Sequence, residues 1–129
     1  MNGAARLAGV VMLAACACRA NGSGQRLELK ARCAEAGRRA REELRENLGS
    51  EIFLGEPQYA YSEQFETCLY ADAHGLISQD TATSDIHYFV MDVFSGRTLA
   101  EYSTNGDGIV FRGTTKQEFE KKRKELMGF

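Results

Sequence analysis

An apolar stripe with helical spacing near the start of the chain is the feature that most constrains the fold. From Leu27 to Leu48, apolar and small residues recur every three or four positions, at Leu29, Cys33, Ala36, Ala40, Leu44 and Leu48. This period puts them on one face of an α-helix. Charged pairs such as Glu35 and Arg39 fill the opposite face and support the helix. The sequence therefore predicts a helix that stops at Gly49 and packs one side against another layer.

The next segment alternates in a way that predicts a β-hairpin. Tyr59 and Tyr61 alternate with small residues, and a polar turn at 62–64 leads into an apolar run over 65–71. With a two-residue loop at the turn, Tyr59 lies opposite Cys68. Because side chains alternate along a strand, one face of this hairpin then meets the helix. The residues predicted to share that face are Tyr59, Tyr61, Cys68 and Tyr70.

Further segments extend the predicted sheet. Residues 86–94 are apolar on both alternations, which is typical of a central strand. The other predicted elements are a loop over 74–84, a turn at 95–97, a strand over 98–102 and a short edge strand over 109–111. We interpret Asn105–Gly108 as a tight turn, because Ser103 and Thr114 occupy two positions where a calcium loop needs acidic ligands.

The C-terminal segment carries a helix-start signal. Thr115 and Glu118 have the spacing of a capping box, and Phe119, Leu126 and Met127 fall on one side of the helix that follows. The predicted fold class is therefore α+β. An N-terminal helix packs on a roughly four-stranded antiparallel sheet, followed by a short C-terminal helix, all in a single domain over 27–129.

The first fifteen residues have a different character from the rest. They combine one positive charge at Arg6, a short apolar run over 7–13 and two alanines. This is the layout of a secretory signal. The apolar run is much shorter than the roughly 20 residues that a membrane-spanning helix needs. We therefore predict that residues 1–15 are a signal peptide and take no part in the fold.

The end of that segment resembles a known motif. Leu13-Ala14-Ala15-Cys16 is similar to the lipobox of bacterial lipoproteins, and the resemblance implies cleavage before Cys16 and a lipid on its sulfur. It also implies a bacterial envelope location, with Ala17 favouring the outer membrane of a Gram-negative cell. Two or more acyl chains hold a protein stably at a membrane. Residues 16–26, rich in glycine and serine at 22–24, are predicted to be a flexible tether that spans about 17 Å.

The remaining cysteines predict one disulfide. With Cys16 lipidated, Cys18, Cys33 and Cys68 are left, and exported domains keep disulfides. We predict the bridge Cys33–Cys68, because each of these residues lies in a predicted regular element. Closing a loop of about 36 residues contributes about 3–4 kcal/mol in the chain-entropy model. No cysteine cluster has the spacing of metal ligands, so we expect no metal or other cofactor.

Composition and motifs limit the function classes. The net charge of −2 gives no footprint for nucleic acid. We find no phosphate-binding loop and no nucleophile motif, and the pair Asp72 and His74 lacks a recognisable nucleophile. We therefore expect a non-catalytic binding or accessory module with a protein partner. The folded part, 27–129, resembles no characterised family closely.

Two features bear on how such a module would bind. One helix covers one face of a sheet, so the other face either presents an apolar partner surface or is covered by the C-terminal helix, and the sequence does not decide between the two. The candidate residues of that partner surface are Phe65, Leu69, Phe89 and Met91. The alternative function is inhibition of an envelope or host hydrolase, with the loop 74–84 as the inhibitory element. The small size, disulfide and export signal motivate that alternative.

Overall fold

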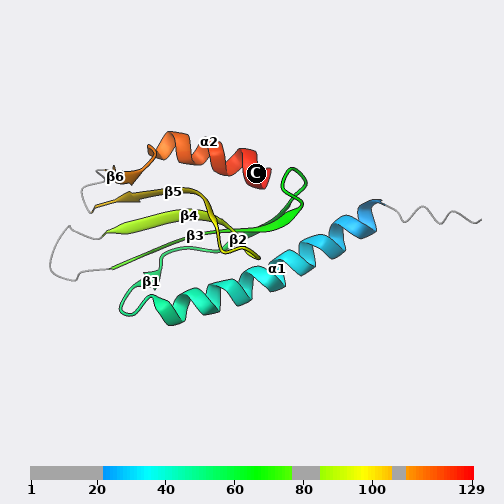
Figure 1. Ribbon diagram of the computed structural model, residues 1–129, viewed down its shortest axis with the longest axis horizontal. Helices are drawn as coiled ribbons and strands as arrows, with labels where there is room; N and C mark the ends of the chain where they lie inside the picture. The colour runs from blue at the N-terminus through cyan, green and yellow to red at the C-terminus, as the bar shows by residue number, and fades with distance from the viewer. Residues whose placement is uncertain (1–21, 77–84, 106–109) are drawn as a thin grey trace, which may run out of the picture.

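The computed structural model describes residues 22–76, 85–105 and 110–129, and it places an antiparallel sheet between two helices (Figure 1). This is the predicted α+β class. In chain order the elements are α1 (Gly22–Asn47), β1 (Ile52–Phe53), β2 (Gln58–Ser62), β3 (Thr67–Gly75), β4 (Ile86–Asp92), β5 (Thr98–Thr104), β6 (Val110–Gly113) and α2 (Lys116–Met127).

One edge of the sheet, beside β3, is formed by two short strands with a break between them. The strands run β1-β3-β4-β5-β6, all neighbours are antiparallel, and β2 also pairs with β3. β1 pairs with the end of β3 at His74 and Gly75, whereas β2 pairs with its earlier part, from Thr67 to Ala71. The two short strands therefore share one edge of β3, separated by residues 54–57. β4 is central in this order, as predicted.

The face under α2 holds the apolar core. Phe119, Leu126 and Met127 of α2 are buried, and they pack against the sheet residues Ala60, Leu69, Ala71, Val90 and Tyr102. The predicted capping box forms, since the Thr115 hydroxyl accepts from the Glu118 N–H and Glu118 accepts from the Thr115 N–H. Gly128 ends the helix in the left-handed conformation, at φ 79°.

The face under α1 is held differently. In this helix of 26 residues only Cys33 and Gly37 are buried. Cys33 and Cys68 lie at disulfide distance, with their sulfurs 2.07 Å apart, which confirms the predicted pair. At Gly37 the helix backbone closely approaches the sheet, because a Cβ there would lie 2.1 Å from Cδ1 of Tyr59. The predicted apolar stripe of this helix was correct in outline. The closest approach of the helix to the sheet, however, is at Gly37, one position after the predicted Ala36.

The hairpin register differs from the prediction by two residues. Tyr61, not Tyr59, lies opposite Cys68, and Tyr59 lies opposite Tyr70. The reason is a turn of four residues, 63–66, closed by Glu66 in the left-handed region at φ 48°. Because a shift of two keeps the alternation, the four residues predicted to face the helix still share one face.

Two boundaries also differ. α1 begins at Gly22, so residues 22–26 of the predicted tether are helical. Once the packed turns around Cys33 are formed, extending a helix costs propagation only and not nucleation. The predicted loop over 74–84 begins too early, because His74 and Gly75 pair with β1 on one side and with β4 on the other. The rest of that loop, 77–84, lies outside the described residues, as do the signal segment, Cys16, Cys18 and most of the turn at 105–108.

Candidate functional site

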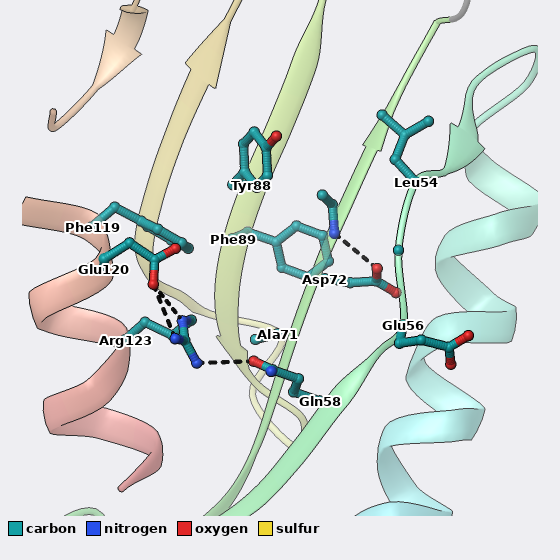
Figure 2. A pocket seen from close by; sticks show the side chains of 12 residues that line it. Leu54, Glu56, Gln58, Ala71, Asp72, Tyr88, Phe89, Phe119, Glu120 and Arg123 are labelled. Atoms are coloured by element: carbon teal, nitrogen blue, oxygen red, sulfur yellow. Dashed lines mark hydrogen bonds and ion pairs between the residues drawn. The ribbon is translucent and has the colours of Figure 1, made fainter. Parts of the chain in front are cut away.

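A polar-rimmed cavity of about 290 Å³ lies beside the break between β1 and β2 (Figure 2). Its floor comes from the sheet and from α2, with Ala71, Tyr88 and Phe119. Its rim holds Leu54, Glu56, Gln58, Glu120 and Arg123. The cavity exists because the chain leaves the edge of β3 after Phe53 and returns at Gln58.

Arg123 is the only cation lining this cavity, and most of its donors are occupied. Its guanidinium donates to the Glu120 carboxylate at 3.0 and 3.1 Å, to Oε1 of Gln58 at 3.0 Å and to the Phe129 carbonyl at 3.0 Å. Figure 2 shows the first two partners converging on it from α2 and β2. Arg123 therefore braces α2 against β2, which explains its place in the cavity without a ligand.

Asp72 contacts the same cavity, but its carboxylate belongs to a network on the α1 face. Oδ2 accepts from Nε of Arg41 at 2.8 Å and from the Tyr70 hydroxyl at 2.6 Å, and Oδ1 accepts from the Ala73 N–H at 2.8 Å. The Asp72 side chain is fully buried. A buried carboxylate is tolerated only with such partners. Arg41 also lies over the Phe53 ring, 4.2 Å from its centroid.

The pKa shifts in this network follow from burial and from Asp72. Burial and the neighbouring Asp72 carboxylate raise the pKa of Tyr70 far above its usual value. Burial alone would lower the pKa of Arg41, but the hydrogen bond and charge of Asp72 outweigh it and raise that pKa. Both shifts hold Tyr70 as a neutral donor and Arg41 as a cation. The network therefore joins α1 to β3.

The two histidines meet across strands. His74 and His87 are direct partners on β3 and β4, with ring centroids 5.1 Å apart. Nδ1 of His74 lies 3.4 Å from Glu51, and Nε2 of His87 lies 3.4 Å from Glu101. Nδ1 of His87 is hydrogen-bonded to the Ser103 hydroxyl at 2.8 Å. Sequence reasoning missed this contact, because it depends on the register between β3 and β4.

The candidate partner surface is not one surface. Leu69 and Phe89 are 0% and 4% exposed, and Phe65 in the hairpin turn is 46% exposed. The register pairs Asp72 with Phe89 and Tyr70 with Met91, so Phe89 and Met91 share the α1 face with Tyr70. Leu69 faces the opposite way and is covered by α2. Coverage by the C-terminal helix is therefore the arrangement found, of the two that the sequence left open. Phe89 and Met91 lie on the other face than expected, because a strand that is apolar on both alternations does not reveal which residues face which layer.

A second hollow, which we call the edge groove, runs along the outer side of β2. It measures about 580 Å³, and three successive residues of β2, Tyr59, Ala60 and Tyr61, line it. One wall comes from α1 with Leu29, Lys30 and Ala34, and the other from the chain end with Met127, Gly128 and Phe129. More of its exposed lining is apolar than polar. This combination of size and lining is typical of a binding site.

Comparisons of the chain with protein-family models, with curated proteins and with solved structures found no match. Within the described ranges, neither helix has the apolar length needed to cross a membrane. No group of three or more metal-ligating side chains converges in that same part of the chain.

Proposed function

We propose that this protein is a small non-catalytic binding module, held at a bacterial envelope by a lipid on Cys16. The edge groove is the observation that carries the binding function. Three successive residues of β2 line it, it is walled on two sides, and its accessible lining is mainly apolar. Sites of this kind take a partner by shape and apolar contact and need no reacting group.

The anchor rests on the sequence. Leu13-Ala14-Ala15-Cys16 follows a basic start and a short apolar run, as in the lipobox of bacterial lipoproteins. Ala17 favours the outer membrane in a Gram-negative cell. α1 begins at Gly22, so residues 17–21 separate the helix from the lipidated cysteine. A link this short keeps the binding module close to the lipid surface.

The disulfide supports an extracytoplasmic location. Cys33 and Cys68 lie at bonding distance between α1 and β3, and disulfides persist in oxidising compartments. Cys33 is one of the two buried residues of α1. A disulfide between the first helix and the sheet suits export better than a reducing cytosol.

Fractionation of cells that express the full chain tests the anchor. The wild type is expected in the membrane fraction, with an intact mass that lacks residues 1–15 and carries added acyl groups. Cys16→Ser removes the acceptor sulfur and is expected to abolish both the processing and the membrane association. Cys18→Ser is the matched control and is expected to behave as the wild type. Membrane association of Cys16→Ser, or loss of it in Cys18→Ser alone, would contradict the assignment.

A further inference from the structure

We propose that β2 binds an extended segment of a partner protein as an added strand, with its side chains in the edge groove. This inference rests on the proposed binding function and names the form of the partner. It follows from the direction of the β2 backbone groups, from the lack of edge protection and from the two walls of the groove.

Two hydrogen bonds fix the direction of the backbone groups. The Val93 N–H donates to the Cys68 carbonyl at 3.0 Å, so the backbone groups of Cys68 point toward β4. The Leu54 N–H donates to the Ala73 carbonyl at 2.9 Å, so those of Ala73 point toward the other edge. Backbone groups alternate in direction along an antiparallel strand. The backbone N–H and C=O groups of residues 67, 69 and 71 therefore point toward β2. Their hydrogen-bonded partners in β2 are Ser62, Ala60 and Gln58.

It follows that Tyr59 and Tyr61 turn their backbone groups outward. Their partners on β3 are Tyr70 and Cys68, whose backbone groups point toward β4. The pairs Tyr59–Tyr70 and Tyr61–Cys68 are therefore non-hydrogen-bonded pairs of the ladder. Within the described ranges, no hydrogen bond reaches the N–H or the carbonyl of Tyr59 or Tyr61. Two donors and two acceptors thus lie along the edge groove, spaced to fit the main chain of one further strand.

β2 also lacks the features that usually protect an edge. Its five residues, QYAYS, include no charge and no proline, and its pairing with β3 has no bulge. β6, at the opposite edge, is shorter and pairs with β5 through an irregular register. β1 has only two residues. An unprotected edge strand of ordinary length is a template for pairing with a further strand. Among the edge strands in the described part of the chain, β2 meets these conditions.

The two walls of the edge groove favour a single extended segment as the partner. Leu29 and Ala34 stand on the side that the Tyr59 and Tyr61 side chains face, whereas Met127 and Phe129 stand on the side of Ala60. An added strand therefore meets apolar atoms on both of its faces. A second copy of this chain would bring its own α1 and chain end against these walls, so we assign the groove to an extended segment.

The rim adds one charge preference. Arg26 lies 3.8 Å from Glu63, which neutralises it in part. Lys30 is exposed at the same rim and has no ion-pair partner in the described part of the chain. We therefore expect the bound segment to combine apolar side chains with an acidic residue next to Lys30.

Site-specific photo-crosslinking in cells identifies the bound segment. A photoreactive amino acid replaces Lys30 at the rim of the edge groove or Lys122, an exposed residue of α2 outside it, in the full lipidated chain. A partner segment crosslinked from position 30, but not from 122, is the expected result. A partner crosslinked only from 122 would overturn the strand inference and leave the binding function standing. Crosslinks only between copies of this chain would also overturn it, and crosslinks from neither position would contradict both proposals.

The crosslinked segment, made as a synthetic peptide, is then the probe for strand addition. Tyr61→Pro removes the outward N–H but no bond to β3, and Tyr61→Val removes the same ring while keeping the N–H. Loss of one main-chain hydrogen bond predicts that Tyr61→Pro binds the peptide at least about fivefold more weakly than Tyr61→Val. Equal affinities, with both variants folded as judged by thermal unfolding, would show that the peptide does not pair with β2.

Discussion

The two faces of the sheet are covered by helices that are held in different ways. Under α2 the contacts are mainly apolar, with Leu69, Val90 and Tyr102 meeting Phe119 and Leu126, and Arg123 adds a hydrogen bond to Gln58. Under α1 they are a disulfide, a glycine pressed against a tyrosine ring and a buried ion pair from Arg41 to Asp72. Apolar burial works in any compartment, whereas a disulfide needs an oxidising one. The comparison teaches that one half of this small fold depends on where the protein resides.

The largest effect is expected from removing the disulfide. Cys33→Ala with Cys68→Ala opens a loop whose ends are 35 residues apart, and this is expected to lower the free energy of unfolding by about 4 kcal/mol. Urea titration of the oxidised wild type and of the double variant measures the difference. Cys18→Ser serves as the control and should leave the midpoint unchanged. A loss below about 1 kcal/mol would mean that α1 is held mainly by its other contacts.

A methyl group at the close approach of α1 is expected to have a smaller effect. Gly37→Ala puts a Cβ where Tyr59 already stands, 2.1 Å from Cδ1, and such overpacking costs about 1–3 kcal/mol. Gly24→Ala is the matched control in the same helix, since a Cβ there meets nothing within 4 Å. Alanine is the better helix former, so the control is expected to be neutral or slightly stabilising. Equal changes in the two thermal midpoints would refute the close contact.

The smallest effect concerns a carboxylate at the end of β4. Burial alone would raise the pKa of Asp92, but the Phe94 N–H, the Thr67 hydroxyl and the Ser95 N–H bond to it, and the net pKa is lowered. Its stabilising effect is therefore present above the unfolded pKa of 3.8 and is lost as the pH falls through the folded value. Asp92→Asn is expected to cost on the order of 1 kcal/mol at pH 7.

Unfolding of this variant and of the wild type across pH 2–7 checks the sign. The two curves should converge as the pH falls below the folded pKa of Asp92. A gap that widens on acidification would mean that the pKa of Asp92 is raised. This pH dependence belongs to the turn between β4 and β5, so it should persist in the variant that lacks the disulfide.

The sequence predicted those parts of the fold that depend on neighbours along the chain. The capping box at Thr115, the apolar side of α2 and the central position of β4 all follow local rules. The pairing of Cys33 with Cys68 followed from counting cysteines in regular elements. The hairpin face was right even though the loop length was not, because the error was an even number of residues.

What the sequence could not reveal depends on register and on contacts between layers. Arg41 lies in a charged run, and nothing local separates it from the solvated residues around it until Asp72 is placed beneath it. Phe89 was assigned to the wrong face because β4 is apolar on both alternations. The edge groove needs three segments that are distant in the chain, α1, β2 and the residues after α2.

Hydrogen exchange of the full chain before and after reduction tests the contrast between the two faces most directly. The account predicts that reduction speeds amide exchange in α1 around Cys33 and Gly37, while α2 around Phe119 and Leu126 keeps its protection. Equal loss of protection in both helices, or no change in α1, would contradict the claim that the disulfide holds one face and apolar burial the other.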